Sequence, residues 1–457
     1  MLVMKFGGTS VGTGERIAGV AELVARRLSE GPFVVVSAMG GVTDSLLALS
    51  RAAREGDRGA ADAALATLGE RHLAAIEALG LAPEAAAALR GEVARELARL
   101  GGLATGVALL GELSARTSDS ICAAGEILSA ALAAAALEKR GVATARVDPR
   151  EWMATDAGYG GAVPDEAATA ERVARVLLPA RAAGKVVVTG GFVGAAPDGS
   201  TTTLGRGGSD FSAALLGAAL HDSGAPVESI EIWTDVDGIL TSDPRLVPAA
   251  RIIPEVGYAE AAELAFFGAK VLHPATIRPA VTRGIPVRVR NSFRPSAPGT
   301  TVRAEAPGNG VRAVAMRSGV AALFVGSPRM LLAHGYAARV FAVFEKHAVP
   351  VDVIATSEVS ISITVDAKAP LDALARDLSA FAEVEILRDL AVLSVVGRKL
   401  RSTAGVAARV FAAIGDINVV LISQGASETN VTFVVRAVDA PEALRRLHRE
   451  LFEKEAA

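Results

Sequence analysis

Short apolar runs recur along the first two thirds of the chain, and longer patterns with helical spacing separate them. Besides the first six residues, the runs cover residues 33–37, 143–147, 185–189, 230–234 and 286–290. Strands that alternate with helices are typical of a largely parallel sheet covered by helices on both faces. The pattern therefore predicts an α/β fold, a three-layer sandwich whose ligands lie outside the carboxyl ends of the strands.

A long helical stretch interrupts this alternation. Residues 50–110 are rich in alanine, leucine, glutamate and arginine, and they predict a structural helical insert. Residues 117–130 continue as a helix in which Asp119 is expected to act as a cap and Glu126 lies among small apolar residues. A carboxylate there must be paired, hydrogen-bonded or at a cleft. The pattern fits a residue on the helix surface as well as a ligand for a substrate ammonium group.

The pattern changes after Asn291, where proline and glycine become frequent and predict a linker. Beyond it, the pentapeptide at residues 337–341 recurs letter for letter at residues 407–411. Alternating strands at residues 359–365 and 430–435 each have one face to bury. Two small α+β modules are expected, and their polar residues fit surface decoration as well as a ligand-sensing or dimer-forming role.

Composition narrows the class of protein. Of the 457 residues, 51% are hydrophobic and 21% are charged, and the formal net charge is −3. This balance indicates a globular protein of several domains and argues against nucleic acid or an anionic membrane as a partner. The single cysteine, Cys122, fits a reducing compartment, and neither a signal peptide nor a bilayer-spanning stretch is expected. We therefore expect a cytoplasmic protein that acts on small molecules.

Two glycine-rich turns carry charges suited to phosphate. Lys5-Phe-Gly-Gly-Thr-Ser10 reads as strand, turn and helix start, and Gly205-Arg-Gly-Gly-Ser-Asp210 places an arginine and a carboxylate beside another helix start. Glycines allow close backbone approach, and the N–H groups at a helix start attract anions. The alternatives are a turn whose glycines only permit tight packing, and a capped helix with a solvated Arg206.

Further candidates follow the predicted strand at residues 230–234. The loop beyond it contains Asp235, Asp237, Asp243 and Arg245, a composition common in nucleotide-binding loops. Because Asp-Gly and Asp-Pro are equally good turn formers, a structural role fits Asp237 and Asp243 better. Lys270 lies at another helix boundary and, taken without the other motifs, fits a surface residue. His273 fits a cap or packing role better than a catalytic base or a metal ligand.

The sequence contains neither a Walker pattern nor a dinucleotide fingerprint, and no Ser-His-Asp, Cys-His or spaced metal-ligand group is found in it. Glycine turns, two lysines, an arginine and several acids remain. They suit phosphate transfer without a covalent enzyme intermediate, in which catalysis is positioning and charge neutralisation.

Five motifs, in order, resemble those of the aspartate kinases of the amino-acid kinase family. They are the two glycine turns, Trp233-Thr-Asp-Val-Asp-Gly-Ile239, Phe267-Gly-Ala-Lys-Val-Leu-His-Pro274 and the doubled C-terminal modules, so the resemblance covers practically the whole chain. It implies the amino-acid kinase fold followed by two ACT modules. It also implies transfer of the γ-phosphate of ATP to the side-chain carboxylate of L-aspartate, at the head of lysine, threonine and methionine synthesis, with Mg²⁺ as the metal.

The resemblance also implies site residues. Those implied for catalysis are Lys5, Gly8 and Asp210. Those implied for aspartate are Ser37, Thr43, Glu126 for the ammonium group, Phe192, Arg206 for the α-carboxylate, and Ser209. Those implied for ATP are Lys5, Gly7, Gly8, Ser10, Thr234, Asp235, Arg245 and Lys270. No direct protein ligand for the metal is predicted. Many relatives have tyrosine in place of Leu240, which puts an adenine contact at that position in doubt.

For the modules, the resemblance implies an allosteric site for an end-product amino acid, lysine, and a homodimer or a dimer of dimers formed through the ACT domains. The residues implied are Met330, Gly335, Tyr336, Asp352, Thr356, Ser357 and Glu358. The expected domains are a catalytic domain at 1–295 and a regulatory region at 296–457. Within the latter, one ACT domain covers about 317–390 and the other 391–457, completed by a strand from 311–316.

Three alternatives stay open at this point. The chain could be another amino-acid kinase that uses glutamate or carbamate. It could be a sensor that keeps the fold and binds an amino acid without chemistry, although such a sensor has no chemical need for two lysines, Arg206 and Asp210. The effector could be threonine in place of lysine.

Overall fold

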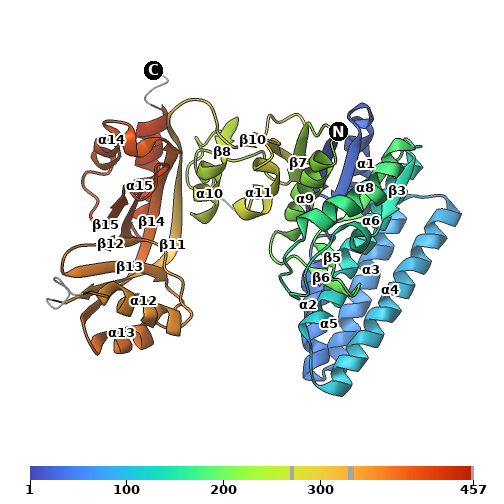
Figure 1. Ribbon diagram of the computed structural model, residues 1–457, viewed down its shortest axis with the longest axis horizontal. Helices are drawn as coiled ribbons and strands as arrows, with labels where there is room; N and C mark the ends of the chain where they lie inside the picture. The colour runs from blue at the N-terminus through green and yellow to red at the C-terminus, as the bar shows by residue number, and fades with distance from the viewer. Residues whose placement is uncertain (268–271, 328–333, 454–457) are drawn as a thin grey trace. The chain divides into compact units, whose positions relative to one another are not determined.

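The computed structural model describes residues 1–267, 272–327 and 334–453. The chain forms two compact units (Figure 1). The first comprises Met1–Ile239 and Val271–Ala304, and the second comprises Leu240–Lys270 and Glu305–Ala457. The second is called the regulatory unit below. Residues 240–270 group with it, whereas the expected boundary was 295/296; that boundary stays a prediction.

A largely parallel sheet forms the centre of the first unit. Within the first unit, the strands of this sheet lie in the order β3-β4-β2-β1-β7-β9-β10, and among them only β10 runs antiparallel to its neighbour β9. The strands are β1 (Leu2–Phe6), β2 (Pro32–Val36), β3 (Thr144–Val147), β4 (Val186–Gly190), β7 (Ser229–Thr234), β9 (Val287–Asn291) and β10 (Thr300–Arg303). The predicted α/β class is confirmed.

Helices cover both faces of this sheet because the side chains of β1 alternate between them. Leu2, Met4 and Phe6 share a core with α1 (Gly14–Ala25) and α6 (Ala124–Lys139). On the other face, a Cβ at Gly217 of α9 (Gly208–Asp222) would lie 2.5 Å from Ile230 of β7. Alternation places Lys5 on this second face, beside α9. The helices α8 (Glu166–Ala182) and α11 (Pro274–Val281) pack against α9.

The predicted helical insert consists of α2 (Val42–Glu55), α3 (Arg58–Leu79) and α4 (Pro83–Leu110), followed by α5 (Ala115–Cys122). The expectation that Asp119 caps a helix is wrong, because Ser114 is the cap of α5 and Asp119 lies inside that helix. Buried there, its carboxylate accepts hydrogen bonds from the amides of Gly160 (2.9 Å) and Thr203 (2.9 Å). Asp119 therefore connects α5 to the loop at Gly160 and to the strand that ends at Thr203.

One stretch, Ala115–Lys139, is long and apolar enough to cross a bilayer, contrary to the expectation that none would be. Of its apolar window, 83% is buried inside the protein. Such burial is what a core helix of a folded domain shows, so the length and composition of the stretch are weak grounds for a membrane span.

The regulatory unit contains a six-stranded antiparallel sheet with the strand order β12-β13-β11-β14-β16-β15. Two long central strands, β11 (Gly310–Gly326) and β14 (Glu383–Arg398), pair along nearly their whole length. The outer strands are β12 (Ile354–Thr356), β13 (Ser360–Asp366), β15 (Val419–Gln424) and β16 (Asn430–Arg436). The helices are α12 (Tyr336–Lys346), α13 (Leu371–Ser379), α14 (Val406–Ala413) and α15 (Ala440–His448). Two α+β modules thus share one sheet.

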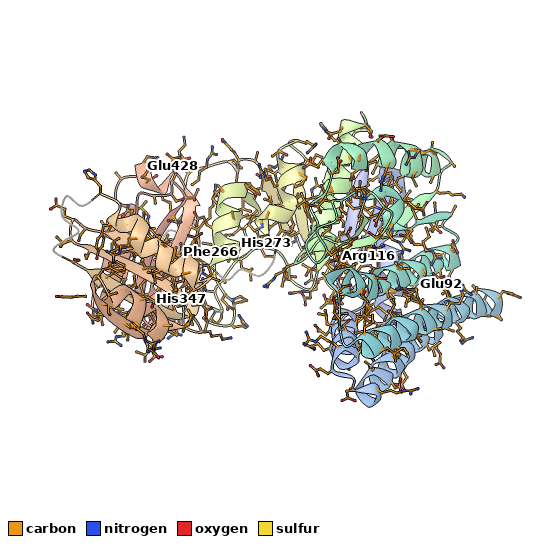
Figure 2. All side chains as sticks on the ribbon, turned by 60° about the horizontal axis from the view of Figure 1, so that its bottom comes forward. Glu92, Arg116, Phe266, His273, His347 and Glu428 are labelled. Carbon is orange, nitrogen blue, oxygen red and sulfur yellow. The ribbon has the colours of Figure 1, made fainter. Side chains whose placement is uncertain are left out.

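Shorter elements complete both units. In the first unit these are α7 (Pro149–Trp152) and the two-stranded sheet of β5 (Val193–Ala195) and β6 (Thr201–Thr203). In the regulatory unit they are β8 (Glu255–Gly257) and α10 (Tyr258–Phe266). The side chains of Phe266 and of His347, at the end of α12, are labelled in Figure 2.

Candidate active site

Lys5 and Asp210 form an ion pair at the carboxyl edge of the central sheet. Lys5 lies in β1 beside Ile232 of β7, and Asp210 lies in the first turn of α9. The Nζ atom of Lys5 is 2.6 Å from Oδ1 of Asp210, and their side chains are only 10% and 16% exposed. Two residues predicted for catalysis, 205 positions apart, are therefore in contact. A buried cation at a strand end can neutralise charge on a phosphoryl group.

The glycine turn after β1 leaves two backbone donors available. The Gly7 amide donates to the Trp233 carbonyl (3.0 Å), and the Ser10 amide donates back to the Gly7 carbonyl (2.9 Å). Within the described part of the chain, the amides of Gly8 and Thr9 donate no hydrogen bond. A Cβ at Gly8 would lie 2.9 Å from the carbonyl oxygen of Ala38, so only glycine allows this approach. The turn can therefore offer N–H groups to an anion.

Ser10 is engaged within the protein. It is 1% exposed, and its hydroxyl lies 2.8 Å from Oγ of Ser292 and 3.3 Å from the carbonyl oxygen of Trp233. These contacts tie the turn to β7 and to the end of β9. A contact of Ser10 with ATP stays a prediction.

The start of α9 supplies further groups for an anion. Gly207 precedes the helix with φ of +73° and no side-chain cap, and the amides of Ser209 and Asp210 have no hydrogen-bond acceptor among the described residues. Arg206 is exposed, and no ion pair within the described ranges engages its guanidinium. A helix start with free N–H groups and an unpaired arginine suits a carboxylate.

The loop after β4 packs directly on this helix start. A Cβ at Gly191 would lie 2.7 Å from Cα of Ser209, which requires glycine. Phe192 has a positive φ of 64°, uncommon for a residue with a side chain, and its amide donates to Oγ of Ser212 (2.9 Å). The loop and the helix start therefore present Phe192 and Ser209 together.

Glu126 is buried in α6, 4% exposed. Burial raises its pKa to about 8, although the Ala38 amide and the charge of Lys5 act in the opposite direction. In the described structure, Oε2 of Glu126 accepts no hydrogen bond. A buried carboxyl group with one unpartnered oxygen, close enough to Lys5 for that charge to affect its pKa, is suited to receive a cationic group.

Two predicted substrate residues lie around the end of β2. The Ser37 amide donates to the Phe6 carbonyl (3.0 Å), which fixes Ser37 beside the end of β1. Thr43 is half-buried in the first turn of α2. Of the residues predicted for aspartate, the structure thus arranges Ser37, Phe192 and Ser209 around neighbouring strand ends and places Glu126 under the influence of Lys5.

The residues predicted for ATP are divided between the units. Thr234 and Asp235 lie at the end of β7, where Oγ1 of Thr234 is 3.1 Å from Oδ1 of Asp235. Arg245 belongs to the regulatory unit, and its guanidinium pairs with Asp243 at 2.7 Å, which lowers the pKa of that carboxyl. Lys270 lies outside the described residues.

Sequence reasoning missed Glu231, a carboxylate with no exposure in the middle of β7. It pairs with Arg27 (3.1 Å) and Arg290 (3.4 Å) and accepts a hydrogen bond from the indole of Trp233 (3.0 Å). The signal was an acid within an apolar strand, opposite arginines that alternate in β9. These contacts fix β7, which neighbours the strand that carries Lys5.

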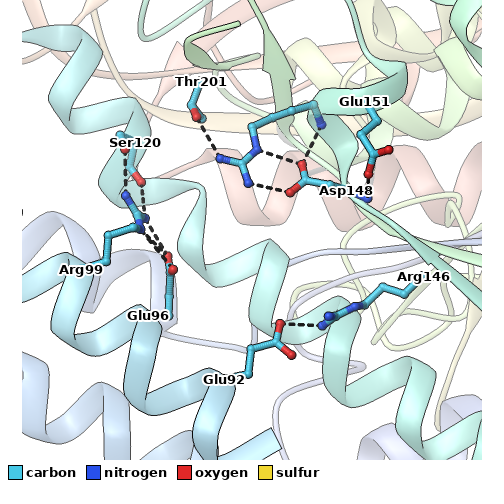
Figure 3. A network of polar contacts seen from close by, with 9 residues as sticks. Glu92, Glu96, Arg99, Ser120, Arg146, Asp148, Glu151 and Thr201 are labelled. Atoms are coloured by element: carbon cyan, nitrogen blue, oxygen red, sulfur yellow. Dashed lines mark hydrogen bonds and ion pairs between the residues drawn. The ribbon is translucent and has the colours of Figure 1, made fainter. Parts of the chain in front are cut away.

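A cavity of about 500 Å³ is lined by Asp148, Arg150, Glu151, Arg172, Arg175, Ala195, Ala196, Pro197 and Gly199. None of these was predicted as a site residue. Figure 3 shows the polar network beside it, in which Arg150 pairs with Asp148 (2.6 Å) and Arg146 pairs with Glu92 (2.6 Å). In the part of the chain that can be described, no group of three or more His, Cys, Asp or Glu is arranged to hold a metal ion.

In the first module of the regulatory unit, the predicted effector residues that the structure describes lie at the start of α12 and at or near the turn between β12 and β13. Gly335 precedes α12 with φ of +78°, and the buried hydroxyl of Tyr336 has no partner among the described residues. Asp352 pairs with Arg317 of β11 at 3.0 Å. Thr356, Ser357 and Glu358 are exposed at the turn. Met330 lies outside the described residues.

Comparisons with known proteins agree with this architecture. The model of the amino acid kinase family matches residues 1–291, and an ACT domain model matches residues 325–376 and 393–451. The chain is 40% identical to lysine-sensitive aspartokinase 3 of Escherichia coli strain K12 over 99% of each chain. The chain belongs to the aspartokinases of the amino acid kinase family.

Other aspartokinases support the same assignment. Aspartokinase 1 of Arabidopsis thaliana, a chloroplast protein, is 37% identical over 99% of this chain and 80% of its own length. A crystal structure of E. coli aspartokinase III in complex with lysine and aspartate superposes with a TM-score of 0.83 and 39% identity, covering 99% of each chain. The complex of that enzyme with aspartate and ADP gives a TM-score of 0.82. The predicted family and enzyme class are confirmed.

Proposed function

We propose that this aspartokinase transfers the γ-phosphate of ATP to the side-chain carboxylate of L-aspartate, giving 4-phospho-L-aspartate for lysine, threonine and methionine synthesis in the cytoplasm. The observation that carries the proposal is the ion pair between Lys5 and Asp210, next to the free amides of Gly8 and Thr9. The solved E. coli relative binds aspartate and ADP, which supports both substrates.

The residues of the first unit suit each part of this reaction. Lys5 and the amide of Gly8 neutralise charge on the phosphoryl group as it moves, and Asp210 orients the Lys5 ammonium. Arg206 and the N–H groups at the start of α9 bind the α-carboxylate of aspartate. Bound ATP with Mg²⁺ supplies the phosphoryl group and screens its charge. Without a cluster of acids among the described residues, the metal fits best when it is held mainly by phosphate and water.

The raised pKa of Glu126 predicts that aspartate binding releases a proton. With its pKa raised to about 8, Glu126 is mostly protonated at pH 7 in the free enzyme. An ammonium group bound beside it favours the charged carboxylate, so aspartate binding should release close to one proton near pH 7. Titration calorimetry in buffers of different ionisation enthalpy measures this release.

Glu126→Gln should abolish that release, because no proton is left to lose. The raised pKa of Glu126 also makes folding stability depend on pH. The folded pKa lies above the unfolded value of 4.5, so the folded state holds the extra proton and stability falls as the pH rises from about 4.5 to about 8. Equal proton release by the parent and by Glu126→Gln would contradict the assignment.

The reaction is tested by trapping the acyl phosphate as a hydroxamate. Turnover should require ATP, Mg²⁺ and aspartate, and Lys5→Ala should lower kcat by about a hundred-fold or more, as removal of one charge-stabilising donor does elsewhere. The matched control is Lys185→Ala, which removes an exposed lysine just before β4 and should keep the parent rate. Unchanged turnover in Lys5→Ala would overturn the role of the glycine turn.

Two other outcomes identify the remaining candidates. Turnover with glutamate or carbamate but not with aspartate would move the protein to another group of amino-acid kinases. Amino-acid binding without any turnover would show a sensor that has kept the fold.

For regulation, we propose lysine as the inhibitor and a homodimer or dimer of dimers formed through the ACT domains. The solved E. coli relative carries lysine, which supports the choice over threonine. Hydroxamate assays with lysine, threonine or methionine decide between effectors, and inhibition by threonine alone would refute the choice of lysine. Sedimentation measures the oligomer.

A further inference from the structure

The start of α9 and the buried carboxyl group of Glu126 lie on either side of two adjacent glycines. A Cβ at Gly190 would lie 3.0 Å from Cβ of Glu126, and a Cβ at Gly191 would lie 2.7 Å from Cα of Ser209. Among the described residues, one oxygen of Glu126 has no partner and the amide of Ser209 has no acceptor. The first unit therefore brings an acceptor for a cation close to donors for an anion, which is what an α-amino acid requires.

Arg206 adds a charged donor to the anion side of this arrangement. The amide of Gly208 donates to the Gly205 carbonyl (3.1 Å), which closes a turn that contains Arg206. Asp210, the partner of Lys5, follows in the first turn of α9. Within the described ranges, no ion pair engages the Arg206 guanidinium. Where that guanidinium lies therefore depends on what holds the chain before the turn.

Asp119 holds this preceding part of the chain. Its Oδ1 accepts from the Thr203 hydroxyl (2.7 Å), and its Oδ2 accepts from the amides of Thr203 (2.9 Å) and Gly160 (2.9 Å). Thr203 ends β6, three residues before Arg206. The Gly160 carbonyl oxygen would lie 3.4 Å from a Cβ at Gly205. The carboxylate of Asp119, a residue only 3% exposed, thus fixes two segments that adjoin the turn with Arg206.

Asp119 and Glu126 belong to one helical stretch. Only Ala123 separates α5 from α6, and its amide donates to the Asp119 carbonyl (3.0 Å) while its carbonyl accepts from the Ile127 amide (3.3 Å). Asp119 precedes Glu126 by two helical turns, so both side chains lie on one side of the stretch. The same stretch therefore carries the orphan acid and the carboxylate that anchors the turn with Arg206.

We propose that Asp119 is a positioning residue for the amino-acid substrate. It sets the separation between Arg206, which binds the α-carboxylate, and Glu126, which receives the ammonium group. A carboxylate suits this place because the groups that bond to it are all donors, whereas asparagine would point its own N–H group at one of them. This inference rests on the proposed binding of aspartate by Arg206 and Glu126.

Steady-state kinetics of the full chain test the proposal with two neighbouring threonines of β6. Thr203→Val removes the hydroxyl that bonds Asp119 and should raise KM for aspartate about five-fold, the effect of one lost hydrogen bond, while KM for ATP stays at the parent value. Thr203→Ser should restore KM for aspartate. Thr202→Val is the matched control: the Thr202 hydroxyl is also buried but bonds Thr155 (2.6 Å), and its loss should leave both KM values unchanged.

Two further variants test the anchor and its route of action. Asp119→Asn should raise KM for aspartate about ten-fold or more, because a hydrogen bond to a charged group is lost and two donors then face one another. If Asp119→Asn does not fold, Thr203→Val decides alone. In Thr203→Val combined with Arg206→Ala, KM for aspartate should equal that of Arg206→Ala, because Thr203 acts through Arg206.

The possible failures are distinguishable. If the parent gives no aspartate-dependent hydroxamate, the proposed function fails, and the positioning proposal fails with it. If the parent turns over aspartate but Arg206→Ala leaves KM for aspartate unchanged, the reaction stands, whereas the role of Arg206 and the positioning proposal are wrong. If Arg206→Ala raises that KM and Thr203→Val does not, only the positioning proposal is overturned. Equal rises in both KM values after Thr203→Val, or the same rise after Thr202→Val, would show general destabilisation and would also overturn it.

Discussion

The two modules of the regulatory unit have similar sequences, but the glutamates at their corresponding positions, Glu358 and Glu428, have different partners. The pentapeptide at residues 337–341 recurs 70 positions later, as does the pair Ser357-Glu358, which returns as Ser427-Glu428. In the second module, Glu428 pairs with Arg401 at 2.7 Å, and the Ser427 hydroxyl donates to Glu263 (3.0 Å). In the first module, the described residues provide no ion pair for Glu358. Glu428 is labelled in Figure 2.

This difference shows that a repeated sequence does not make a repeated site. A carboxylate already neutralised by arginine gains little from an ammonium ligand, whereas an unpaired one gains a charge-assisted hydrogen bond. The cores differ too. The core around α12 and α13 contains residues of the first module, whereas the core around α14 and α15 also takes in Val247. Among the described residues, Glu358 of the first module is thus unpaired, whereas the second module packs against the segment that carries Arg245.

The largest expected effect is on lysine inhibition, and it distinguishes Glu358 from Glu428. Glu358→Gln should raise the lysine concentration for half-inhibition by roughly ten-fold or more, because a charge-assisted hydrogen bond to the effector is lost. Glu428→Gln is the matched control and should leave inhibition unchanged. Lysine titrations of the hydroxamate assay measure both, and equal shifts would mean that the modules share the effector.

A second difference concerns Asp352, whose position 70 residues later is occupied by Ile422. Asp352→Asn breaks the pair with Arg317, in which the aspartate side chain is 9% exposed, and should lower the free energy of unfolding by about 2 kcal/mol. Ile422→Asn alters a side chain that is 46% exposed and should change little. Urea denaturation compares the two, and an equal loss would contradict a structural role for the ion pair.

The glycines that precede α12 and α14 should respond alike to substitution, as expected if the two modules begin these helices in the same way. Gly335 and Gly405 precede α12 and α14 with φ of +78° and +80°. Gly335→Ala and Gly405→Ala should each cost about 1 kcal/mol, since a Cβ disfavours this conformation. Thermal unfolding measures both variants. A cost in only one of them would show that the two starts are not equivalent.

The smallest effect is expected at Tyr336, which corresponds to Val406 in the repeat. Its buried hydroxyl lacks a partner in the described structure, so Tyr336→Phe should leave stability unchanged or slightly higher without effector. If the hydroxyl bonds the effector, lysine inhibition should weaken about three-fold. Val406→Ala is the comparison in the second module and should not alter inhibition. A clear loss of stability in Tyr336→Phe would show that the hydroxyl already has a partner.

Several parts of the site could be predicted because their signals are local. Lys5, the glycine turn and the start of α9 are contiguous stretches whose spacing and turn chemistry specify strand, turn and helix. Asp119 was misread because Ser114, five positions earlier, caps the helix, and the partners of Asp119 lie at Gly160 and Thr203. Glu231 was missed because its arginine partners come from distant segments.

The sequence by itself determined the order of strands and helices, the phosphate-suited turn and the doubled modules, because periodicity and glycine content act over a few residues. Only the tertiary structure decided that Lys5 meets Asp210 and that the pKa of Glu126 rises to about 8. It alone placed residues 240–254 on the ACT sheet. Burial and charge pairing depend on groups that are far apart in the chain, and no local pattern encodes them.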